Sequence, residues 1–136
     1  NLQGDVIALV NSSGSVSARY SYDPWGRPTV QNPDGTTNTS STFIGNLNPL
    51  RFKGYYYDTE TGFYYLQSRY YDPTIGRFIN ADAYASTGQG FIGCNMFAYC
   101  NNNPEGRSDE KGTDPWDKFE NTRTIFLFFF YRNSII

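Results

Sequence analysis

The sequence contains no histidine and only two cysteines among its 136 residues. Without histidine the chain lacks the commonest general base and metal ligand, which excludes histidine-dependent serine or cysteine catalysis and histidine-ligated zinc. Cys94 and Cys100 cannot form a four-ligand zinc site by themselves. We expect them to be free thiols, with a disulfide as the alternative if the segment between them is a hairpin. The sequence therefore predicts neither a bound metal nor a cofactor.

Long apolar stretches and clusters of basic residues are also missing. The longest aromatic and apolar run, Ile125 to Tyr131, is far shorter than the about 20 residues that cross a bilayer, so we expect no membrane span. The 11 Lys and Arg residues are spread along a chain of formal charge −2, which argues against nucleic acid as a partner. The chain lacks an initiator Met, and we expect it to be a piece of a longer protein.

Aromatic and turn-forming residues are abundant instead. The chain has 12 Tyr, 11 Phe and 2 Trp, which favour strands, together with 13 Gly and 7 Pro, which interrupt them. The sequence therefore predicts an all-β protein of short antiparallel hairpins. Turn residues delimit six predicted strands, at residues 5–10, 15–22, 27–31, 51–57, 63–71 and 77–84.

The segment 63–71 shows the clearest two-residue period of the chain. An uninterrupted strand there would place Tyr65, Arg69 and Tyr71 on one face and Tyr64 and Tyr70 on the other. Because aromatic residues occupy both faces, we expect both to be covered by neighbouring elements.

Three segments share one pattern, in which Tyr-Asp is followed by a short polar link and then Gly. The Asp side chain accepts hydrogen bonds from backbone N–H groups ahead of it, and Gly accepts a positive φ where the chain reverses. The pattern therefore predicts a hairpin corner in each segment. The Arg that follows Gly in two copies is expected to pair with a carboxylate or stack on a tyrosine. The motif residues are Tyr22, Asp23, Gly26 and Arg27, then Tyr57, Asp58 and Gly62, then Tyr71, Asp72, Gly76 and Arg77.

The run from Arg51 to Ile79 resembles the Rhs repeat-associated core domain at the end of YD-repeat proteins. The resemblance extends back through residues 4–10 and 22–27 and forward through residues 95–104. It implies three regions. These are YD-repeat hairpins with a polar loop at 1–50, the Rhs core at 51–112, and an irregular, variable C-terminal tail at 113–136.

The resemblance implies a β-ribbon that forms part of a spiral β-solenoid, the hollow YD-repeat shell of bacterial Rhs and wall-associated polymorphic toxins and of teneurins. In those families the shell encloses or presents a C-terminal toxin or effector, and the core closes one end as a plug. The expected function is therefore structural and the expected location is secreted or at the bacterial cell surface. The implied partners are the rest of the shell and the effector in the same chain.

A first alternative function is self-cleavage by an aspartyl protease site. By resemblance to the cleaving families, Asp82 and Asp109 would be the two catalytic carboxylates, one acting as base and the other as acid. The sequence departs from the family where Ala83 follows Asp82 in place of Pro, and where Asp109 is followed by Glu110 without the usual Pro and Leu. We expect both aspartates to cap turns, with a working or vestigial protease as the alternative.

A second alternative is a carbohydrate or cell-wall binding module. Repeated aromatic hairpins such as Gly62 to Leu66 resemble wall-binding repeats, in which exposed rings stack on sugars or choline, and Tyr64 is the ring to substitute in a test. The competing expectation is that the rings pack between neighbouring strands, because large aromatic surfaces are normally buried. Cell-wall glycans are thus a possible partner of the chain.

Overall fold

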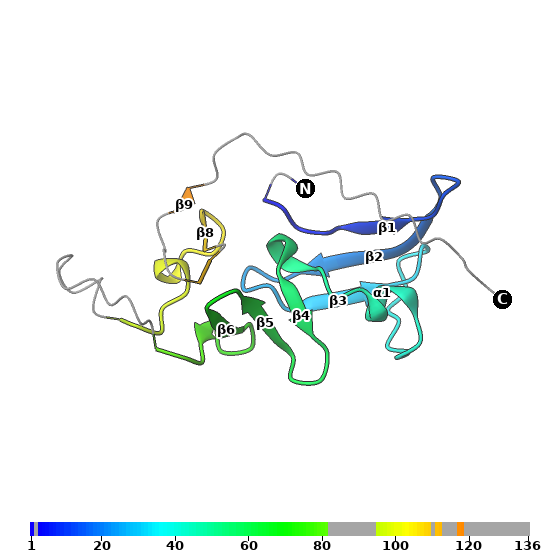
Figure 1. The fold of residues 1–136 in the computed structure, drawn as a ribbon. Helices are drawn as coiled ribbons and strands as arrows, with labels where there is room; N and C mark the ends of the chain where they lie inside the picture. The colour runs from blue at the N-terminus through cyan, green and yellow to red at the C-terminus, as the bar shows by residue number, and fades with distance from the viewer. Residues whose placement is uncertain (2, 82–94, 110, 113–116, 119–136) are drawn as a thin grey trace.

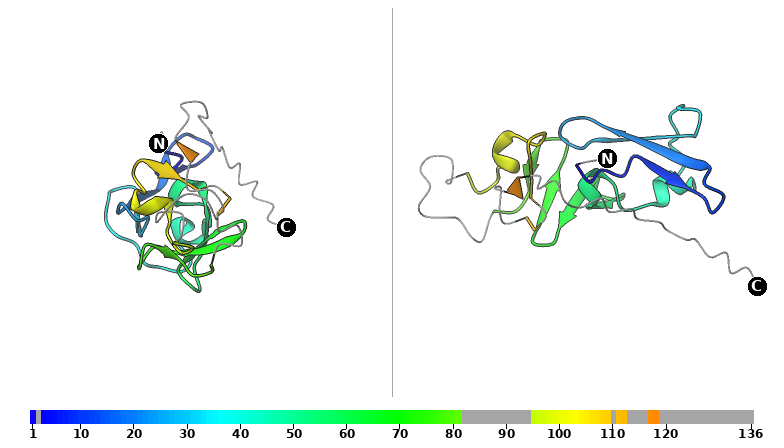
Figure 2. Two further views of the ribbon diagram at one scale, coloured as in Figure 1. Left: turned by 90° about the vertical axis from the view of Figure 1, so that its left-hand side faces the viewer. Right: turned by 90° about the horizontal axis from the view of Figure 1, so that it is seen from above.

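The computed structural model describes residues 1, 3–81, 95–109, 111–112 and 117–118. This part of the chain consists of short antiparallel strands and tight turns, with a single turn of α-helix, which confirms the predicted all-β hairpin ribbon. Two sheets follow one another along the long axis of the molecule, as Figures 1 and 2 show.

The first sheet has three strands in the order β1-β2-β3. They are β1 (Ala8–Val10), β2 (Val16–Tyr22) and β3 (Pro28–Gln31). The short helix α1 (Ile44–Leu47) packs on this sheet, and a Cβ on Gly45 would lie 2.6 Å from Val30 and 3.0 Å from Ala18. The Tyr20 hydroxyl donates a hydrogen bond of 2.7 Å to the Gly45 carbonyl. Glycine thus allows α1 to lie directly against β2 and β3.

The second sheet has four strands in sequence order. They are β4 (Tyr56–Asp58), β5 (Phe63–Leu66), β6 (Arg69–Asp72) and β7 (Arg77–Phe78). The prediction of one strand over 63–71 was wrong, because the chain reverses after Leu66. Gln67 adopts a φ of 59°, and the Ser68 N–H donates to the Leu66 carbonyl at 2.6 Å.

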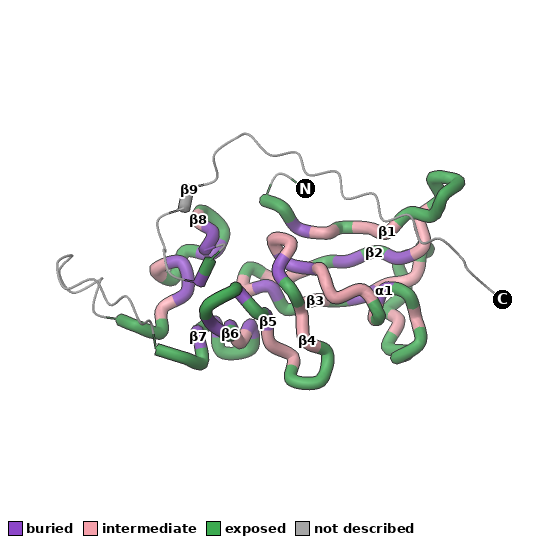
Figure 3. The backbone as a smooth tube through the Cα atoms, viewed as in Figure 1, coloured by how far each residue is buried: buried purple, intermediate pink, exposed green. Residues whose placement is uncertain are grey.

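This reversal also changes which side chains share a face. The two residues of the turn shift the phase, so that Tyr64 and Arg69 both point into the core while Tyr65 and Tyr70 point outward, where each is 43% exposed. The expectation that both faces are covered was therefore wrong for these residues. Figure 3 shows the alternation of buried and exposed positions along this sheet.

The strand predicted over 51–57 begins only at Tyr56, because the chain first forms a 3₁₀ turn, η1 (Phe52–Gly54). In this turn Lys53 has a φ of 51°, and its N–H donates to the Asp5 carboxylate at 2.8 Å. The turn brings both Phe52 and Tyr55 into the core. Two other predicted strands are also shorter, since the first begins at Ala8 and the last ends at Phe78, while its end from residue 82 lies outside the described residues.

The main core is a cluster of aromatic rings between the second sheet and the segment around Tyr99. Tyr71 and Tyr99 have ring centroids 4.1 Å apart, and Tyr57 and Tyr64 have centroids 4.9 Å apart. Tyr64 and Tyr71 face one another across β5 and β6. The buried members of the cluster are Phe52, Tyr55, Tyr64, Leu66, Tyr71, Phe78, Tyr99 and Cys100.

The remaining described elements lie beyond the second sheet. They are η2 (Cys100–Asn102), β8 (Arg107–Ser108) and β9 (Asp117–Lys118). Strand β9 pairs with β8 and belongs to the region that was predicted to be an irregular tail. The division of the chain at residues 50 and 112 stays a prediction. Cys100 is a buried free thiol, and Cys94 lies outside the described residues.

None of the helices among the described residues has the length and apolar character needed to cross a membrane. Within the same residues, no group of three or more Cys, Asp or Glu side chains is arranged to hold a metal ion.

Candidate functional site

The aspartates of the Tyr-Asp repeats lie at hairpin corners and accept backbone hydrogen bonds. The Asp23 carboxylate accepts from the Trp25 and Arg27 N–H groups, both at 2.9 Å. Asp58 accepts from the Glu60 N–H at 3.0 Å, and Asp72 accepts from the Thr74 N–H at 2.7 Å. Hydrogen bonds from Thr61 and Glu60 lower the pKa of the Asp58 carboxyl, which holds the charged form needed for capping.

The corners also hold one another in place. The Tyr64 hydroxyl donates to the Gly26 carbonyl and the Tyr71 hydroxyl donates to the Trp25 carbonyl, each at 2.8 Å. Arg27 pairs with its own corner aspartate Asp23 at 3.2 Å. The first corner therefore rests directly on the sheet that carries the second and third copies of the motif.

Arg27 also reaches the third corner. Its Nε donates to the Pro73 carbonyl at 3.3 Å and its Nη2 donates to the Thr74 carbonyl at 3.2 Å. Arg77, the equivalent arginine of the third copy, is exposed on β7, opposite Asp72 of β6. The two arginines thus occupy equivalent motif positions in different surroundings.

Asp109, one of the two predicted catalytic residues, is fully buried directly after β8. Its carboxylate forms an ion pair of 3.3 Å with Arg69 Nη2. Its backbone N–H donates to the Tyr55 hydroxyl at 3.2 Å, and this hydroxyl also contacts the Tyr99 hydroxyl at 3.3 Å. Asp109 is therefore part of the aromatic core and not of a solvent-exposed turn.

Arg69 is the residue that connects Asp109 to the second sheet, and sequence analysis missed this role. Only 5% of Arg69 is exposed, and its guanidinium carbon lies 3.5 Å from the centre of the Phe78 ring. Its Nη1 donates to the Met96 carbonyl at 2.9 Å and its Nε donates to the Gly112 carbonyl. The signal in the sequence was an arginine placed between tyrosines. Its burial could be inferred only after the position of the turn at Gln67 was known, because this turn decides which residues of β6 point into the core.

The carbonyls of Arg107, Lys111 and Gly112 are contacted by side chains from η1 and from the second sheet, including its turn between β5 and β6. Lys53 Nζ donates to the Pro104 carbonyl at 2.6 Å and to the Arg107 carbonyl. The Ser68 hydroxyl contacts the Lys111 and Gly112 carbonyls at 2.6 and 2.9 Å. Burial lowers the pKa of the Lys53 ammonium and raises the pKa of the Cys100 thiol to about 11.

The chemistry available to this site depends on a second carboxyl group. Peptide hydrolysis by an aspartyl site requires one carboxylate as base and one carboxylic acid as proton donor. Asp82, the predicted partner of Asp109, lies outside the described residues, and the pairing of the two stays a prediction. The described contacts of Asp109 hold its carboxylate against Arg69 and its backbone N–H against the Tyr55 hydroxyl.

Comparison with known proteins identifies similar chains. The model of the family described as RHS Repeat matches residues 1–37. The chain is 40% identical over 116 residues to the tRNA3(Ser)-specific nuclease WapA of Bacillus spizizenii, a match over 85% of this chain and 5% of that protein. It is 35% identical over 108 residues to the double-stranded DNA deaminase toxin A of Burkholderia cenocepacia, over 79% of this chain and 6% of that protein.

Solved structures share the fold. The crystal structure of TcdB2-TccC3-Cdc42 matches with a TM-score of 0.65 and 26% sequence identity, over 88% of this chain and 5% of that chain. A structure of TcdB2-TccC3 without its hypervariable C-terminal region matches with a TM-score of 0.66 and 27% identity. The chain therefore corresponds to a small part of each of these much longer proteins.

Proposed function

The chain belongs to the Rhs-repeat family, and we propose that it is a wall segment of a YD-repeat β-shell that encloses or presents a C-terminal toxin or effector. The observation that carries this proposal is the direct contact of the first Tyr-Asp corner with the second sheet and with the third corner. Tyr64 and Tyr71 donate their hydroxyls to the first corner, and Arg27 donates to the third. The first repeat is thus stabilised by the repeats that follow it, as expected for a solenoid wall.

An edge of the first sheet supports the same proposal. A sheet edge presents unpaired N–H and C=O groups that accept another strand. The first sheet has β1 and β3 at its edges and the second has β4 and β7. Strands β3, β4 and β7 already bond Asn38, Pro49 and Phe97, respectively. Further hairpins of the same parent chain would extend the wall from the edge of β1.

Within the shell we assign residues 51–112 a plug role at one end of the wall. The support for it is the segment 107–112, which folds back onto the second sheet through Arg69, Lys53 and Ser68. The segment would then lead the chain from the wall toward the effector. We further infer that the parent protein acts outside the cell that produces it.

The experiment is electron microscopy of the full-length protein. The proposal expects a hollow particle in which the C-terminal region is protected from added protease until the shell is unfolded. A solid particle without a cavity, or a C-terminal region cleaved as fast in the folded as in the unfolded protein, would contradict it.

A second candidate function is aspartyl self-cleavage near Asp109. It is favoured by one observation, the complete burial of Asp109 beside Arg69. A carboxylate held in one position by an ion pair meets part of the positioning requirement of general acid and base catalysis.

Mass spectrometry of the full-length protein tests this candidate. Self-cleavage predicts a cut wild-type chain, an uncut chain after Asp109→Asn or Asp82→Asn, and a cut chain in the control Asp58→Asn at an ordinary corner. An uncut chain in all samples leaves Asp109 with a structural role only.

The hairpin named for glycan binding, Gly62 to Leu66, has one buried and one exposed tyrosine ring. Tyr64 has no exposed surface, so it cannot stack on a sugar. The exposed tyrosines of the second sheet are Tyr56, Tyr65 and Tyr70, and the register places Tyr65 opposite both of the others. Their exposure by itself does not identify a ligand.

A further inference from the structure

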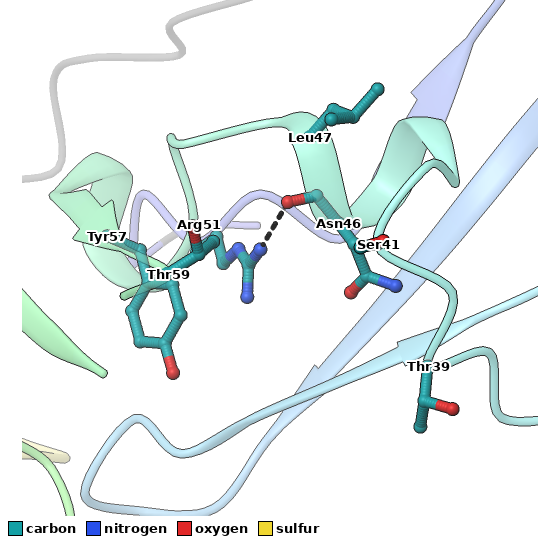
Figure 4. Close-up of a pocket in the computed structure, with 7 residues that line it drawn as sticks. All are labelled: Thr39, Ser41, Asn46, Leu47, Arg51, Tyr57 and Thr59. Atoms are coloured by element: carbon teal, nitrogen blue, oxygen red, sulfur yellow. Dashed lines mark hydrogen bonds between the residues drawn. The ribbon is translucent and has the colours of Figure 1, made fainter. Parts of the chain in front are cut away.

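A pocket of about 340 Å³ lies between the connection that follows β3 and the start of the second sheet. Figure 4 shows Arg51 and Tyr57 on one side of it and Asn46 and Thr39 on the other. Its volume is within the range of about 300–1,000 Å³ typical of small-molecule sites. Of the residues that line the pocket, only Tyr57 belongs to a Tyr-Asp motif.

Arg51 is a buried, positively charged residue that lines the pocket. Only 3% of the residue is exposed. Its Nε donates to the Asn48 carbonyl at 3.2 Å and its Nη2 donates to the Asn46 carbonyl at 3.0 Å. Its guanidinium carbon lies 4.3 Å from the centre of the Tyr57 ring. One edge of the guanidinium is therefore fixed by neutral carbonyls and one face by an aromatic ring.

The charge of Arg51 has no anionic partner in the part of the chain that the structure describes. The ion pairs found there are Arg27 with Asp23 and Arg69 with Asp109. Nη1 of Arg51 makes no hydrogen bond among the same residues, and Figure 4 shows a guanidinium nitrogen turned away from Asn46. A buried guanidinium without a counter-charge favours the arrival of an anion.

The other polar groups of the pocket suit a ligand that carries hydroxyl groups. The side-chain hydroxyls of Thr39, Ser41 and Thr59 line it, and none of them makes a hydrogen bond within the described residues. Asn46 donates its Nδ2 to the Asn38 and Ser40 carbonyls, both at 2.9 Å. The side-chain oxygen of Asn46 is thereby left to accept a hydrogen bond from a ligand.

We propose that this pocket binds a small hydroxylated carboxylate, with sugar acids as the chemical class. A carboxylate matches the planar donors of Arg51, and the sugar hydroxyls match Thr39, Ser41 and the Asn46 oxygen. A neutral sugar would leave the guanidinium uncompensated. Phosphate or sulfate would bring more negative charge than one arginine balances, and no second cationic side chain lines the pocket among the described residues.

The experiment is isothermal titration calorimetry on the full-length protein with glucuronate, glucose and inorganic phosphate as separate probes. The proposal expects glucuronate to bind at least tenfold more tightly than either of the others. Absence of glucuronate binding, or phosphate binding as tight as that of glucuronate, would overturn it.

A second test uses a variant whose own side chain occupies the place proposed for the carboxylate of the ligand. Arg51 is unsuitable for substitution because its bonds to Asn46 and Asn48 hold the surrounding backbone. Thr59→Glu places a carboxylate at the pocket wall, where it would compete with the ligand. We expect at least a tenfold loss of glucuronate affinity with an unchanged circular dichroism spectrum.

The matched control is Thr29→Glu, which adds the same charge at an exposed position of β3, away from the pocket. It should leave glucuronate binding within a factor of two of the wild type. Equal binding by the Thr59→Glu and Thr29→Glu variants would place the ligand elsewhere. These outcomes are independent of whether the parent protein forms a hollow shell.

Discussion

The three glycines of the Tyr-Asp motif share a left-handed backbone but differ in their surroundings. Their φ values are +88° at Gly26, +77° at Gly62 and +66° at Gly76. A Cβ would lie 2.5 Å from the Phe52 ring at Gly26 and 2.7 Å from the Trp25 ring at Gly76. At Gly62 the nearest atom would be 3.7 Å away. The motif therefore uses glycine for chain reversal in all three copies and for ring packing in two.

Alanine substitutions separate these two uses. Gly62→Ala should lower the free energy of unfolding by about 1–2 kcal/mol, the cost of a left-handed L-residue. Gly26→Ala and Gly76→Ala should each cost a further ~1–3 kcal/mol, because the ring beside them must move. Urea unfolding of the three variants measures the differences. Equal losses in all three would show that the rings move aside without cost.

Arg69 is expected to be more important for stability than any exposed arginine. Arg69→Leu removes the partner of buried Asp109 and the donors to the Met96 and Gly112 carbonyls. Breaking a buried ion pair from one side typically costs about 3–5 kcal/mol. The matched variant Arg77→Leu, on the surface of β7, should change stability by less than about 0.5 kcal/mol.

Thermal and urea unfolding compare the two arginine variants. A loss of under about 1 kcal/mol in Arg69→Leu would mean that the buried ion pair contributes little beyond packing. The same samples report on residues 107–112, since Arg69→Leu should accelerate hydrogen exchange there before it does so in the first sheet.

The sequence predicted individual functional groups better than their partners. Asp109 was singled out by resemblance and the corner aspartates by local turn chemistry, which depends on a few adjacent residues. Arg69 was missed because its partner lies 40 positions away in the chain. Arg51 was assigned to a regular strand, although it is buried beside the turn that follows it and donates to the carbonyl of Asn46, five residues before it.

At the scale of the elements, the turns decide what the residue pattern means. The hairpin corners with Asp and Gly were predictable because these residues have strong turn preferences. The turn between β5 and β6 consists of Gln67 and Ser68, and neither Asp nor Gly marks it. The two-residue period of the sequence therefore ran across the turn without a visible break. A two-residue hairpin of this kind is usually marked by glycine at its first position.

Replacing Gln67 by glycine should therefore stabilise the second sheet. Gln67 has a φ of 59°, which disfavours an L-residue by about 1–2 kcal/mol, and part of this is offset by the greater freedom of glycine in the unfolded chain. The expected net gain is about 1 kcal/mol by urea unfolding. Ser68→Gly, the control in the same turn, should lower stability because it loses the contacts to Lys111 and Gly112. A gain in the Ser68 variant or a loss in the Gln67 variant would contradict this account of the turn.

At the scale of the whole molecule, tyrosine hydroxyls join segments that are distant in the sequence. Tyr22 donates to the Val6 carbonyl at 2.7 Å, and Tyr64 reaches across to the first corner at Gly26. The Tyr55 hydroxyl accepts from the Asp109 N–H. The bonds that Tyr22 and Tyr64 donate require protonated phenols, so the contacts of both sheets with the first corner and with Val6 depend on the same chemical state.

That dependence predicts a sharp loss of stability in alkaline solution. Burial raises the pKa of Tyr55, Tyr64, Tyr71 and Tyr99 above the ordinary value of 10.0 and raises the pKa of Cys100 to about 11. Above pH 10.0 the unfolded chain therefore releases phenol protons that the folded chain retains, so rising pH favours unfolding. Each such tyrosine removes about 1.4 kcal/mol of stability per pH unit, and several together exceed the total stability of a typical domain within one or two units.

Parallel pH titrations followed by tyrosinate absorbance and by circular dichroism test this coupling. We expect the buried tyrosines to ionise in the same steep transition that removes the β-sheet signal. Tyr71→Phe keeps the ring and removes one ionisable group, at the loss of its bond to the Trp25 carbonyl. It should lower stability at neutral pH by about 1 kcal/mol, yet make the alkaline transition less steep. Gradual ionisation of all tyrosines with an unchanged dichroism spectrum would show that the aromatic core opens locally and does not unfold as one unit.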